Sequence, residues 1–236
     1  AKIFYKLGIK NIIAVDTNPD RLKQIQEDCK ITKTYNNIDK VLNEKIDFAI
    51  IATPPHIHTE IAIKCANSNI HLFIEKPISV EKEGLENLNK ICLNKNLTCY
   101  VAYCYRYIPS VVKLKKLIDN HEIGKILTYR LWISSYLPDW HPWEDYRSYY
   151  MAFKEQGGGA LYDESHGIDL IRWLFGEVKS VQSNIGNVSD LDISSDDIAL
   201  LLSDHENGIK GSAHFDLLGR SPQIGIEIIG DDGTII

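Results

Sequence analysis

Short apolar runs alternate with amphipathic stretches from residue 1 to residue 107. The pattern predicts strands at 11–16, 47–55, 71–77 and 97–107, and helices at 19–29, 58–69 and 79–96. The strand "DFAIIATPP" at 47–55 has no polar alternation, which is typical of a strand covered on both faces. Repeated β-α-β units of this kind imply a parallel sheet with helices on both of its faces.

Two helices of this half carry recognisable start signals. Pro19 stands near the start of the helix at 19–29, where a missing N–H is harmless. Ser79 is a candidate N-cap for the helix at 79–96, because acidic residues follow it in the first turn. Ligands of parallel sheets bind outside the carboxyl ends of the strands. We therefore expect one ligand-facing edge made of Asp16, 53–58, 75–77 and 103–106.

The pattern changes after Pro109. A helix is expected at 110–120, a long strand at 126–137, an aromatic loop at 138–150, and a glycine run that leads into a helix at 157–177. Short strands follow from Val178 onward, with a hairpin turn at "DHENG". This half is expected to be an α+β domain with an open, mostly antiparallel sheet. The boundary is expected near residues 105–110, which gives one predicted domain at 1–107 and a second at 108–236.

Composition narrows the class of partner. The 236 residues carry a net charge of −6 and contain no long Lys/Arg run, which argues against nucleic acid or an anionic membrane as the main partner. The sequence has no apolar run of membrane-spanning length and no secretory leader. The five cysteines are scattered and lack zinc-ligand spacing, so we expect free thiols in a reducing cytoplasm and no metal site.

The start of the sequence lacks one part of a dinucleotide-binding unit. "AKIFYKLGIKNIIAVD" reads as the end of a helix, a turn at Gly8 and a strand. The first strand and its G-x-G-x-x-G turn would precede this point, and that glycine pattern does not occur in the sequence. The last residues, "GDDGTII", also stop within what reads as a strand. Either the chain is a piece of a longer protein, incomplete at both ends, or the phosphate-binding turn was never present. We favour the first, because a parallel sheet without its first strand would expose strand edges.

Two candidate residues stand at the ends of predicted strands. Asp16 occupies the position where an acid binds the adenosine ribose of a dinucleotide and favours NAD, although Arg21 keeps NADP possible. An ordinary turn or cap aspartate is the alternative. Lys76 follows the apolar strand "HLFIE" at the ligand edge, and Pro77 fixes the backbone there, with a cis bond as one possibility. A solvent-facing lysine is equally compatible with "EKP" alone.

A second candidate cluster lies in "GGGALYDESHGID". Asp163 and His166 are three residues apart and would share one face of a helix, where a carboxylate can set the tautomer of an imidazole. Asp169 would extend this row. The glycines at 157–159 would let the backbone approach a ligand. A capping pair followed by an ordinary loop is the alternative. A metal site would need a third ligand, and the sequence indicates none.

The aromatic loop has two open interpretations. Its aromatic side chains could stack on a sugar face, or they could pin the loop down by packing, which we favour slightly. These side chains are Trp140, His141, Trp143 and Tyr146.

Taken together, these segments resemble the Gfo/Idh/MocA family of NAD(P)-dependent sugar and polyol oxidoreductases. The resemblance covers nearly the whole chain and is carried by "DFAIIATPPHIHTEIA", "HLFIEKPIS", "VAYCYRYIPSVVKLKKLI" and "GGGALYDESHGIDLIRWLFGE", which fall in the family's order. It implies that residues 1–107 form a Rossmann-like NAD(P)-binding domain and residues 108–236 a substrate-binding and oligomerisation domain. In the family, this C-terminal α/β domain has an open sheet that often forms the oligomer interface. The loop "YLPDWHPWEDYR" resembles members of surface-sugar or nucleotide-sugar pathways.

The resemblance also implies roles for individual residues. Lys76 would be the catalytic lysine, Asp163 its acidic partner and His166 the general acid/base. The cofactor-binding residues would be Asp16, Thr53, Pro54, His58, Glu75, Lys76 and Pro77, and the substrate residues Tyr105, Arg106, Trp140, Trp143 and His166. Two departures are visible: many members space the acid and the histidine by four residues, and Cys104 stands where members often have asparagine.

These expectations give one function and two alternatives. We expect hydride transfer between NAD or NADP and a secondary alcohol of a sugar, polyol or nucleotide sugar, in a homo-oligomer. The alternatives are an NAD-dependent glycosidase of the same family, which would use the same lysine and histidine, and a non-catalytic protein that senses nucleotides or sugars.

Overall fold

The computed structural model describes residues 2–31 and 33–236. The chain divides into two compact units that are not consecutive in sequence. Unit 1 comprises the residues up to Ile51 together with Glu60–Phe73 and Gly84–Cys99. Unit 2 comprises Ala52–Thr59, Ile74–Glu83 and Tyr100–Ile236. Two short segments from the first half of the sequence therefore belong to unit 2.

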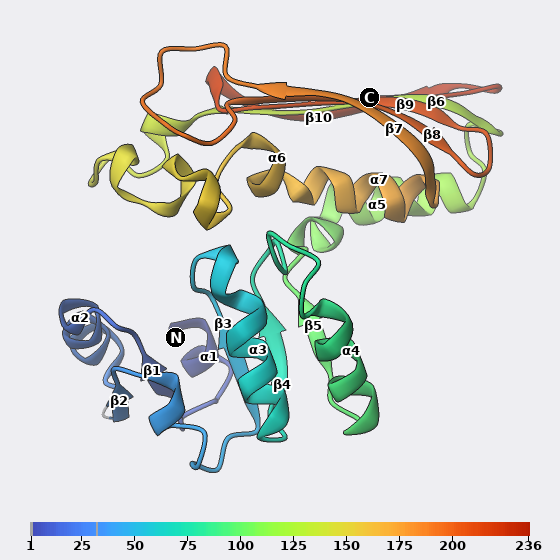
Figure 1. Ribbon diagram of the computed structural model, residues 1–236. Coiled ribbons are helices and arrows are strands. Elements are labelled where there is room, and N and C mark those ends of the chain that lie inside the picture. Colours follow the sequence, from blue (N-terminus) through green and yellow to red (C-terminus); the bar gives the residue numbers. More distant parts are fainter. Residues whose placement is uncertain (1, 32) are drawn as a thin grey trace. The chain divides into compact units, whose positions relative to one another are not determined.

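The first half of the chain has Rossmann-like β-α-β order (Figure 1). Its helices are α1 (Lys2–Lys6), α2 (Pro19–Cys29), α3 (His58–Asn67) and α4 (Leu85–Asn94), with 3₁₀ turns at Ile38–Lys40, Pro55–Ile57 and Cys104–Tyr107. Its strands are β1 (Ile13–Val15), β2 (Lys33–Tyr35), β3 (Phe48–Ile51), β4 (His71–Ile74) and β5 (Cys99–Val101). They form two pieces, a parallel β1-β2 pair and a sheet of order β3-β4-β5, so the single sheet that we expected is divided.

Capping explains one predicted helix and corrects another. Asn18 accepts hydrogen bonds from the backbone N–H groups of Asp20 and Arg21 and starts α2, which has the predicted bounds. The prediction that Ser79 caps the helix expected at 79–96 is wrong. The Ser79 hydroxyl accepts from the N–H of Glu81 in a turn, and α4 begins only after Gly84, whose φ is 78°. Local sequence could not separate these two starts, because both offer a capping group.

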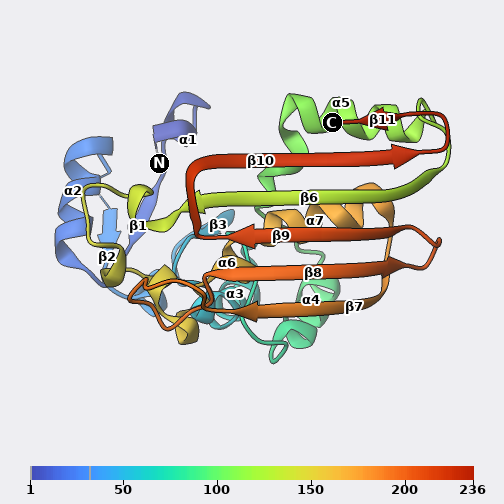
Figure 2. The same ribbon diagram turned by 90° about the horizontal axis from the view of Figure 1, so that it is seen from above.

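The second half contains a six-stranded sheet, shown face-on in Figure 2. Its strands are β6 (Ile126–Tyr136), β7 (Val178–Gly186), β8 (Ile198–His205), β9 (Lys210–Asp216), β10 (Leu218–Gly230) and β11 (Thr234–Ile235), in the order β11-β10-β6-β9-β8-β7. β6 and β9 pair in parallel, with Leu131 opposite Ala213, and the other pairs are antiparallel. The prediction of an open, mostly antiparallel sheet is confirmed.

Helices of this half pack on one face of the sheet. They are α5 (Pro109–Asp119), α6 (Ala160–Asp163) and α7 (Ser165–Phe175), and short 3₁₀ turns lie at Leu137–Asp139, Tyr146–Ser148, Tyr150–Ala152 and Lys154–Gln156. The core between α7 and the sheet is built on Tyr129 and Phe215, both nearly or fully buried. Gly167 permits this close packing, because a Cβ there would lie 2.5 Å from the Phe215 ring.

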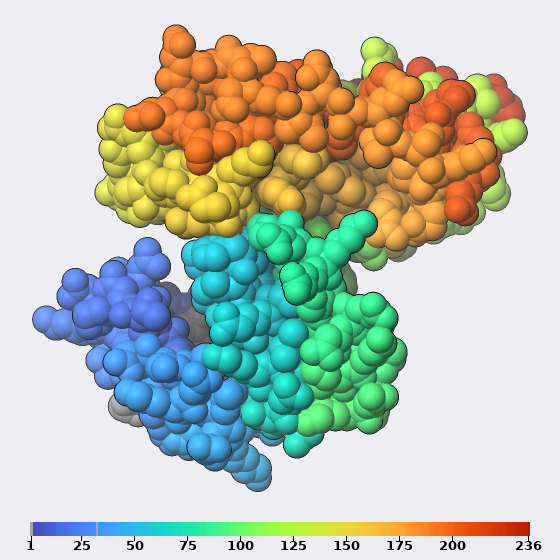
Figure 3. Space-filling model, viewed as in Figure 1, coloured from blue at the N-terminus to red at the C-terminus, as the bar shows by residue number. Residues whose placement is uncertain are grey.

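The outer strand β7 forms one edge of this sheet, and most of its side chains are exposed (Figure 3). Within residues 2–31 and 33–236, no helix combines the length and the apolar character that a bilayer crossing requires.

Candidate functional site

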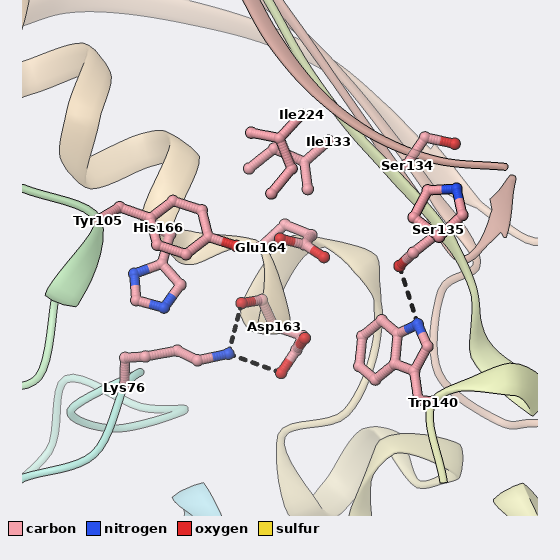
Figure 4. Close-up of a pocket in the computed structure, with 11 residues that line it drawn as sticks. Lys76, Tyr105, Ile133, Ser134, Ser135, Trp140, Asp163, Glu164, His166 and Ile224 are labelled. Carbon is pink, nitrogen blue, oxygen red and sulfur yellow. Dashed lines mark hydrogen bonds and ion pairs between the residues drawn. The ribbon is translucent and has the colours of Figure 1, made fainter. Parts of the chain in front are cut away.

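A cavity of about 290 Å³ lies within unit 2 (Figure 4). Its wall combines titratable groups at one side with apolar and hydroxyl side chains at the other. The lining residues are Lys76, Tyr105, Ile133, Ser134, Ser135, Trp140, Asp163, Glu164, His166, Pro222 and Ile224. The six-stranded sheet supplies five of these residues, from β6 and β10, and the rest come from loops and helix ends. Polar groups that converge on a concave, partly apolar cavity are typical of a small-molecule site.

Lys76 is held by Asp163 at this cavity. The Lys76 ammonium donates to the Asp163 carbonyl oxygen and to its Oδ1, both at 2.7 Å. The two side chains are only 16% and 11% exposed, so water screens the pair weakly. The Tyr150 hydroxyl donates to the same Oδ1 at 3.1 Å, and burial raises the pKa of Tyr150. The Lys76–Pro77 bond is cis.

His166 lies beside this ion pair with its imidazole buried. Its ring stacks on the Tyr105 ring, with centroids 4.0 Å apart and planes 6° apart. Nε2 lies 4.0 Å from the Cys104 sulfur, and Nδ1 has no partner among the residues that the structure describes. Burial, with a further contribution from the Lys76 charge, lowers the pKa of His166 to about 4. The imidazole is therefore neutral at pH 7 and able to accept a proton.

The expectation that Asp163 and His166 share one helix face is wrong. α6 ends at Asp163 and α7 begins at Ser165, and Glu164 between them has φ −84° and ψ 20°. The break directs the Asp163 carboxylate to Lys76 and Tyr150, so it makes no hydrogen bond to the His166 ring. The contact with Lys76, which only the family resemblance implied, is present.

Arg106 and Asp169 form a second ion pair. The Arg106 Nε and Nη2 donate to the two carboxylate oxygens of Asp169 at 2.7 and 2.5 Å. The guanidinium also lies 5.5 Å from the centre of the Trp173 ring, within cation–π range. Arg106 was a candidate substrate residue, but it is not among the residues that line the cavity, and its Nε and Nη2 donors are used by Asp169. Asp169 is thereby committed to Arg106 and does not extend a row toward His166.

The aromatic loop combines the two interpretations. Trp140 lines the cavity, and its indole N–H donates to the Ser135 hydroxyl at 2.9 Å, which fixes the ring by packing and hydrogen bonding. Trp143 is 76% exposed and stacks on His141, with ring centroids 5.1 Å apart. The candidate substrate residues Tyr105, Trp140 and His166 therefore meet at the cavity, and Trp143 does not.

Among the candidate cofactor residues, His58 has a structural position. It is fully buried, with Nδ1 2.9 Å from the carbonyl oxygen of Pro77 and Nε2 2.7 Å from that of Thr53. The imidazole thus ties the Thr53–Pro54 loop to the Lys76–Pro77 turn and presents no surface to a ligand. The expectation that its side chain lines the cofactor edge is corrected accordingly.

The remaining cofactor candidates keep their predicted strand-end positions. Thr53 and Pro54 follow β3, and the Thr53 hydroxyl is buried without a partner among the described residues. Glu75 follows β4, and its Oε2 accepts from the Lys76 N–H at 3.3 Å. Asp16, in unit 1, accepts from the Asn18 N–H at 2.8 Å, which is the turn geometry that we considered as its alternative.

The glycine run approaches protein atoms rather than an open ligand surface. A Cβ at Gly157 would collide with Val80, one at Gly158 with the carbonyl oxygen of Met151, and one at Gly159 with the Asp196 carboxylate. Gly157 and Gly159 also have φ values of 88° and 113°, which disfavour other residues. The run is therefore required by close packing before α6. In the described residues, no group of three or more His, Cys, Asp or Glu side chains is arranged to hold a metal ion.

Two family models match this chain in succession. The model of the oxidoreductase family with an NAD-binding Rossmann fold matches residues 6–103, and that of the GFO/IDH/MocA C-terminal domain matches residues 111–236. The chain belongs to the Gfo/Idh/MocA family.

Curated relatives include several sugar and polyol enzymes. Levoglucosan dehydrogenase of Pseudarthrobacter phenanthrenivorans is 28% identical over 98% of this chain and 65% of its own length. scyllo-Inositol 2-dehydrogenase (NAD(+)) of Bacillus subtilis is 27% identical over 97% of this chain and 66% of its own length. The chain therefore spans about two thirds of the length of these Gfo/Idh/MocA relatives.

Solved structures of the family share the fold. Levoglucosan dehydrogenase in complex with NADH and levoglucosan superposes with a TM-score of 0.83 at 27% identity, over 94% of this chain and 62% of that one. Myo-inositol 2-dehydrogenase from Lactobacillus plantarum reaches a TM-score of 0.86 at 23% identity, over 97% of this chain and 68% of that one. The Rossmann-like unit and the mixed sheet are thus those of Gfo/Idh/MocA dehydrogenases.

Sequence reasoning missed several residues of the site. Glu164 is 5% exposed and lines the cavity, and burial, with further contributions from Asp163 and Asp216, raises its pKa to about 7. Tyr150 contacts Asp163 from the aromatic loop. The sheet residues Ser134 and Ile224 face the cavity from β6 and β10. The signal for Glu164 was its place between the two candidate residues, and the sheet residues had none, because alternation does not say which face carries a site.

Proposed function

We propose that this Gfo/Idh/MocA protein oxidises a secondary alcohol of a sugar, polyol or nucleotide sugar with a nicotinamide cofactor. The observation that supports this most strongly is the pairing of a buried, carboxylate-held Lys76 with a neutral His166 at one cavity. An alcohol oxidation needs a base for the hydroxyl proton and a positive charge near the oxygen. His166 would supply the base, and Lys76 would supply the positive charge.

His166 acts as the base. Its pKa of about 4 keeps the ring neutral at working pH, and stacking on Tyr105 restricts its orientation. The O–H proton of the substrate passes to the imidazole. The carbon that bears this hydroxyl loses its hydrogen together with both electrons of the C–H bond, as a hydride. NAD, when bound, supplies the acceptor for that hydride. Proton transfer by a positioned base typically contributes about 10²- to 10⁴-fold in rate.

Lys76 stabilises the oxygen from which the proton departs. The Asp163 carboxylate and carbonyl fix the ammonium in place, and Tyr150 fixes the carboxylate in turn. A preorganised cation in a partly dry cavity costs no reorganisation during the reaction, and the loss of such a group typically lowers the rate by about 10²- to 10³-fold. Asp163 is a positioning residue in this scheme.

The residues present fit the nicotinamide end of the cofactor. Thr53, with its unsatisfied buried hydroxyl, and Glu75 both follow strands at their carboxyl ends, where such sheets bind dinucleotides. Pro54 and Pro77 shape these two loops. At the adenosine end, Asp16 follows β1 and favours NAD over NADP through the ribose hydroxyl, and Arg21 in α2 is the residue that would serve NADP instead.

The sheet face away from the helices supports a homo-oligomer. Leu200, His214 and Trp132 are cross-strand neighbours on β8, β9 and β6, and Leu202 beside them is 59% exposed. Exposed leucines beside an aromatic side chain on an open sheet face are compatible with an interface between subunits. Leu202→Glu should shift the protein toward monomer in light scattering. The five free cysteines support a cytoplasmic location.

Product analysis tests the proposed reaction. The whole protein is incubated with NAD and a panel of sugars, polyols and nucleotide sugars, beginning with levoglucosan and inositols, and absorbance of the reduced cofactor is followed. We expect net NADH formation matched by an equal amount of ketone product. Sugar cleavage without net NADH would instead identify the NAD-dependent glycosidase reaction, and binding without any product would identify a sensor.

A further inference from the structure

Glu164 is a buried carboxyl group in the wall of the substrate cavity that the proposed reaction does not use. It lies at the break between α6 and α7 and is 5% exposed. Figure 4 shows it beside the Tyr105 ring, above Asp163 and below Ile133 and Ile224. Its position in the chain next to Asp163 puts it at the chemical end of the cavity, and its surroundings are otherwise largely apolar.

The Glu164 carboxyl has no hydrogen-bond donor of its own within residues 2–31 and 33–236. The Lys76 ammonium is committed to the two oxygens of Asp163. Asp216, the other acid that acts on Glu164, accepts from Ser134 and from backbone N–H groups, and pairs with His214. Burying a carboxyl without a donor is costly. A cavity that retains one offers an unused acceptor to whatever enters it.

The charge of the cavity wall is biased against anions. Lys76 is the one cationic side chain among the described lining residues, and Asp163 neutralises it. His166 is neutral near pH 7. Arg106 pairs with Asp169 outside the lining, and Arg220 is exposed and lies over the Tyr136 ring, 3.5 Å from its centroid. No cation of the described lining is thus without a carboxylate partner, and an ionised Glu164 would repel a carboxylate or phosphate.

We propose that Glu164 determines substrate class: it accepts a hydrogen bond from a hydroxyl of an uncharged sugar ring and excludes rings that carry a carboxylate or phosphate. The proposal rests on the proposed function, because it assigns the substrate of the same cavity. Hydroxyl groups suit this position because each can donate to the carboxyl group in either of its protonation states. A second negative charge about 5 Å away, at an effective dielectric constant of about 20, weakens binding by about 10²-fold.

Matched pairs of sugars test this proposal by binding rather than by turnover. Glucose with glucuronate, galactose with galacturonate, and mannose with mannuronate differ only in the group at C6. Their dissociation constants are measured by saturation-transfer NMR with the whole protein and NADH at pH 8. We expect the neutral member of each binding pair to bind about 10- to 100-fold more tightly, and Glu164→Gln to reduce that ratio to less than about 3-fold.

The control is Glu206→Gln, which removes the same charge from the exposed β8–β9 turn and should leave the ratio unchanged. A pH series adds a second readout. Burial above all, and then the charges of Asp163 and Asp216 against that of Lys76, set the Glu164 pKa at about 7. Discrimination should therefore weaken from pH 8 to pH 6 in the unaltered protein and stay constant in Glu164→Gln. Tyr105, with a pKa of about 12, and His166 do not titrate in this window.

Three results would overturn the proposal: tighter binding of the acid in any pair, an unchanged ratio in Glu164→Gln, or no binding by any neutral sugar. These outcomes are separate from the failure of the proposed reaction. Suppose that Glu164→Gln abolishes the discrimination and that no bound neutral sugar yields NADH. The assignment of Glu164 would then stand, and the proposed dehydrogenase reaction would be rejected.

Discussion

Several apolar side chains on the short strands β1 and β3 of unit 1 are far more exposed than those at the centre of the six-stranded sheet of unit 2. In unit 1 the strand residues Val15, Phe48 and Ile50 are 38–41% exposed, on short strands in two separate pieces. In unit 2, Tyr129 and Phe215 on the six-stranded sheet are 1% and 0% exposed. The groups proposed for proton chemistry all belong to unit 2. Lys76 belongs to it although the first, Rossmann-like half of the sequence supplies it.

This difference shows that packing, rather than order along the sequence, decides which residues come together in the site. The loops after β3 and β4 leave unit 1 and join unit 2, where His58 ties them together through two carbonyl groups. The proposed reactive lysine is thereby fixed against Asp163 within unit 2. Substitutions in the two units should therefore differ in both kind and size of effect.

The largest effect is expected at His166. His166→Ala should lower kcat by about 10²- to 10⁴-fold, because the base is lost while the Lys76 charge remains. In the unaltered protein the pKa of about 4 predicts that kcat/KM loses this base only as pH falls toward about 4. His71→Ala, an exposed histidine in unit 1, serves as the control and should change neither value. An acid limb near pH 6.5 that disappears with His166 would contradict the neutral, buried imidazole.

The contrast in packing gives the second prediction. Phe215→Ala should lower the free energy of unfolding by about 3–5 kcal/mol, because the ring is fully buried against Gly167. Phe48→Ala, the same change on a residue that is 40% exposed, should cost about 1 kcal/mol. Denaturant unfolding followed by circular dichroism measures both. Equal losses would mean that unit 1 is packed as tightly as unit 2.

Glu164 predicts a pH-dependent effect on stability. Its folded pKa of about 7 lies above the ordinary value of 4.5, so the folded state is penalised as pH rises through this window. A shift of this size corresponds to about 3 kcal/mol. Relative to the unaltered protein, Glu164→Gln should therefore gain about 2–3 kcal/mol in free energy of unfolding between pH 4 and pH 8. A difference that does not change with pH would show that the carboxyl titrates normally.

The smallest effect concerns the ion pair between Arg106 and Asp169. Arg106→Gln should cost about 1–2 kcal/mol of stability, because the Asp169 carboxylate is 10% exposed and would lose its bidentate partner. Arg147→Gln breaks a similar pair with Asp145, in which both side chains are about half exposed and water screens the charges, so it should leave stability almost unchanged. Thermal unfolding of the two variants side by side distinguishes these values.

The sequence predicted elements well where the deciding signals were local. Pro19 and the polar pattern gave the bounds of α2, and apolar alternation gave β6 to within one residue. The helix break at Glu164 was missed, because "LYDESHGID" is compatible with one continuous helix and only packing against the sheet and Lys76 divides it. At Ser79 the local signal predicted a helix start that is absent, because this good capping residue stands in a turn.

The site was predicted in part. Lys76 was placed at the ligand edge by strand order, but its contact with Asp163, 87 residues away, came from the family resemblance. Tyr150, Glu164 and the sheet residues of the cavity were beyond sequence reasoning, because the direction of a side chain depends on which face the helices cover. For the same reason the sequence did not show that Arg106 pairs with Asp169 or that Trp143 is exposed, so that neither lines the cavity.

One comparison tests the central claim most directly: Lys76→Ala against Lys179→Ala in the whole protein, with NAD affinity and NADH formation measured on the same samples. Lys179 is an exposed lysine on β7 and serves as the matched control. We predict that Lys76→Ala retains NAD binding and loses about 10²- to 10³-fold in turnover, while Lys179→Ala changes neither. Turnover that survives in Lys76→Ala would contradict the assignment of the reactive site.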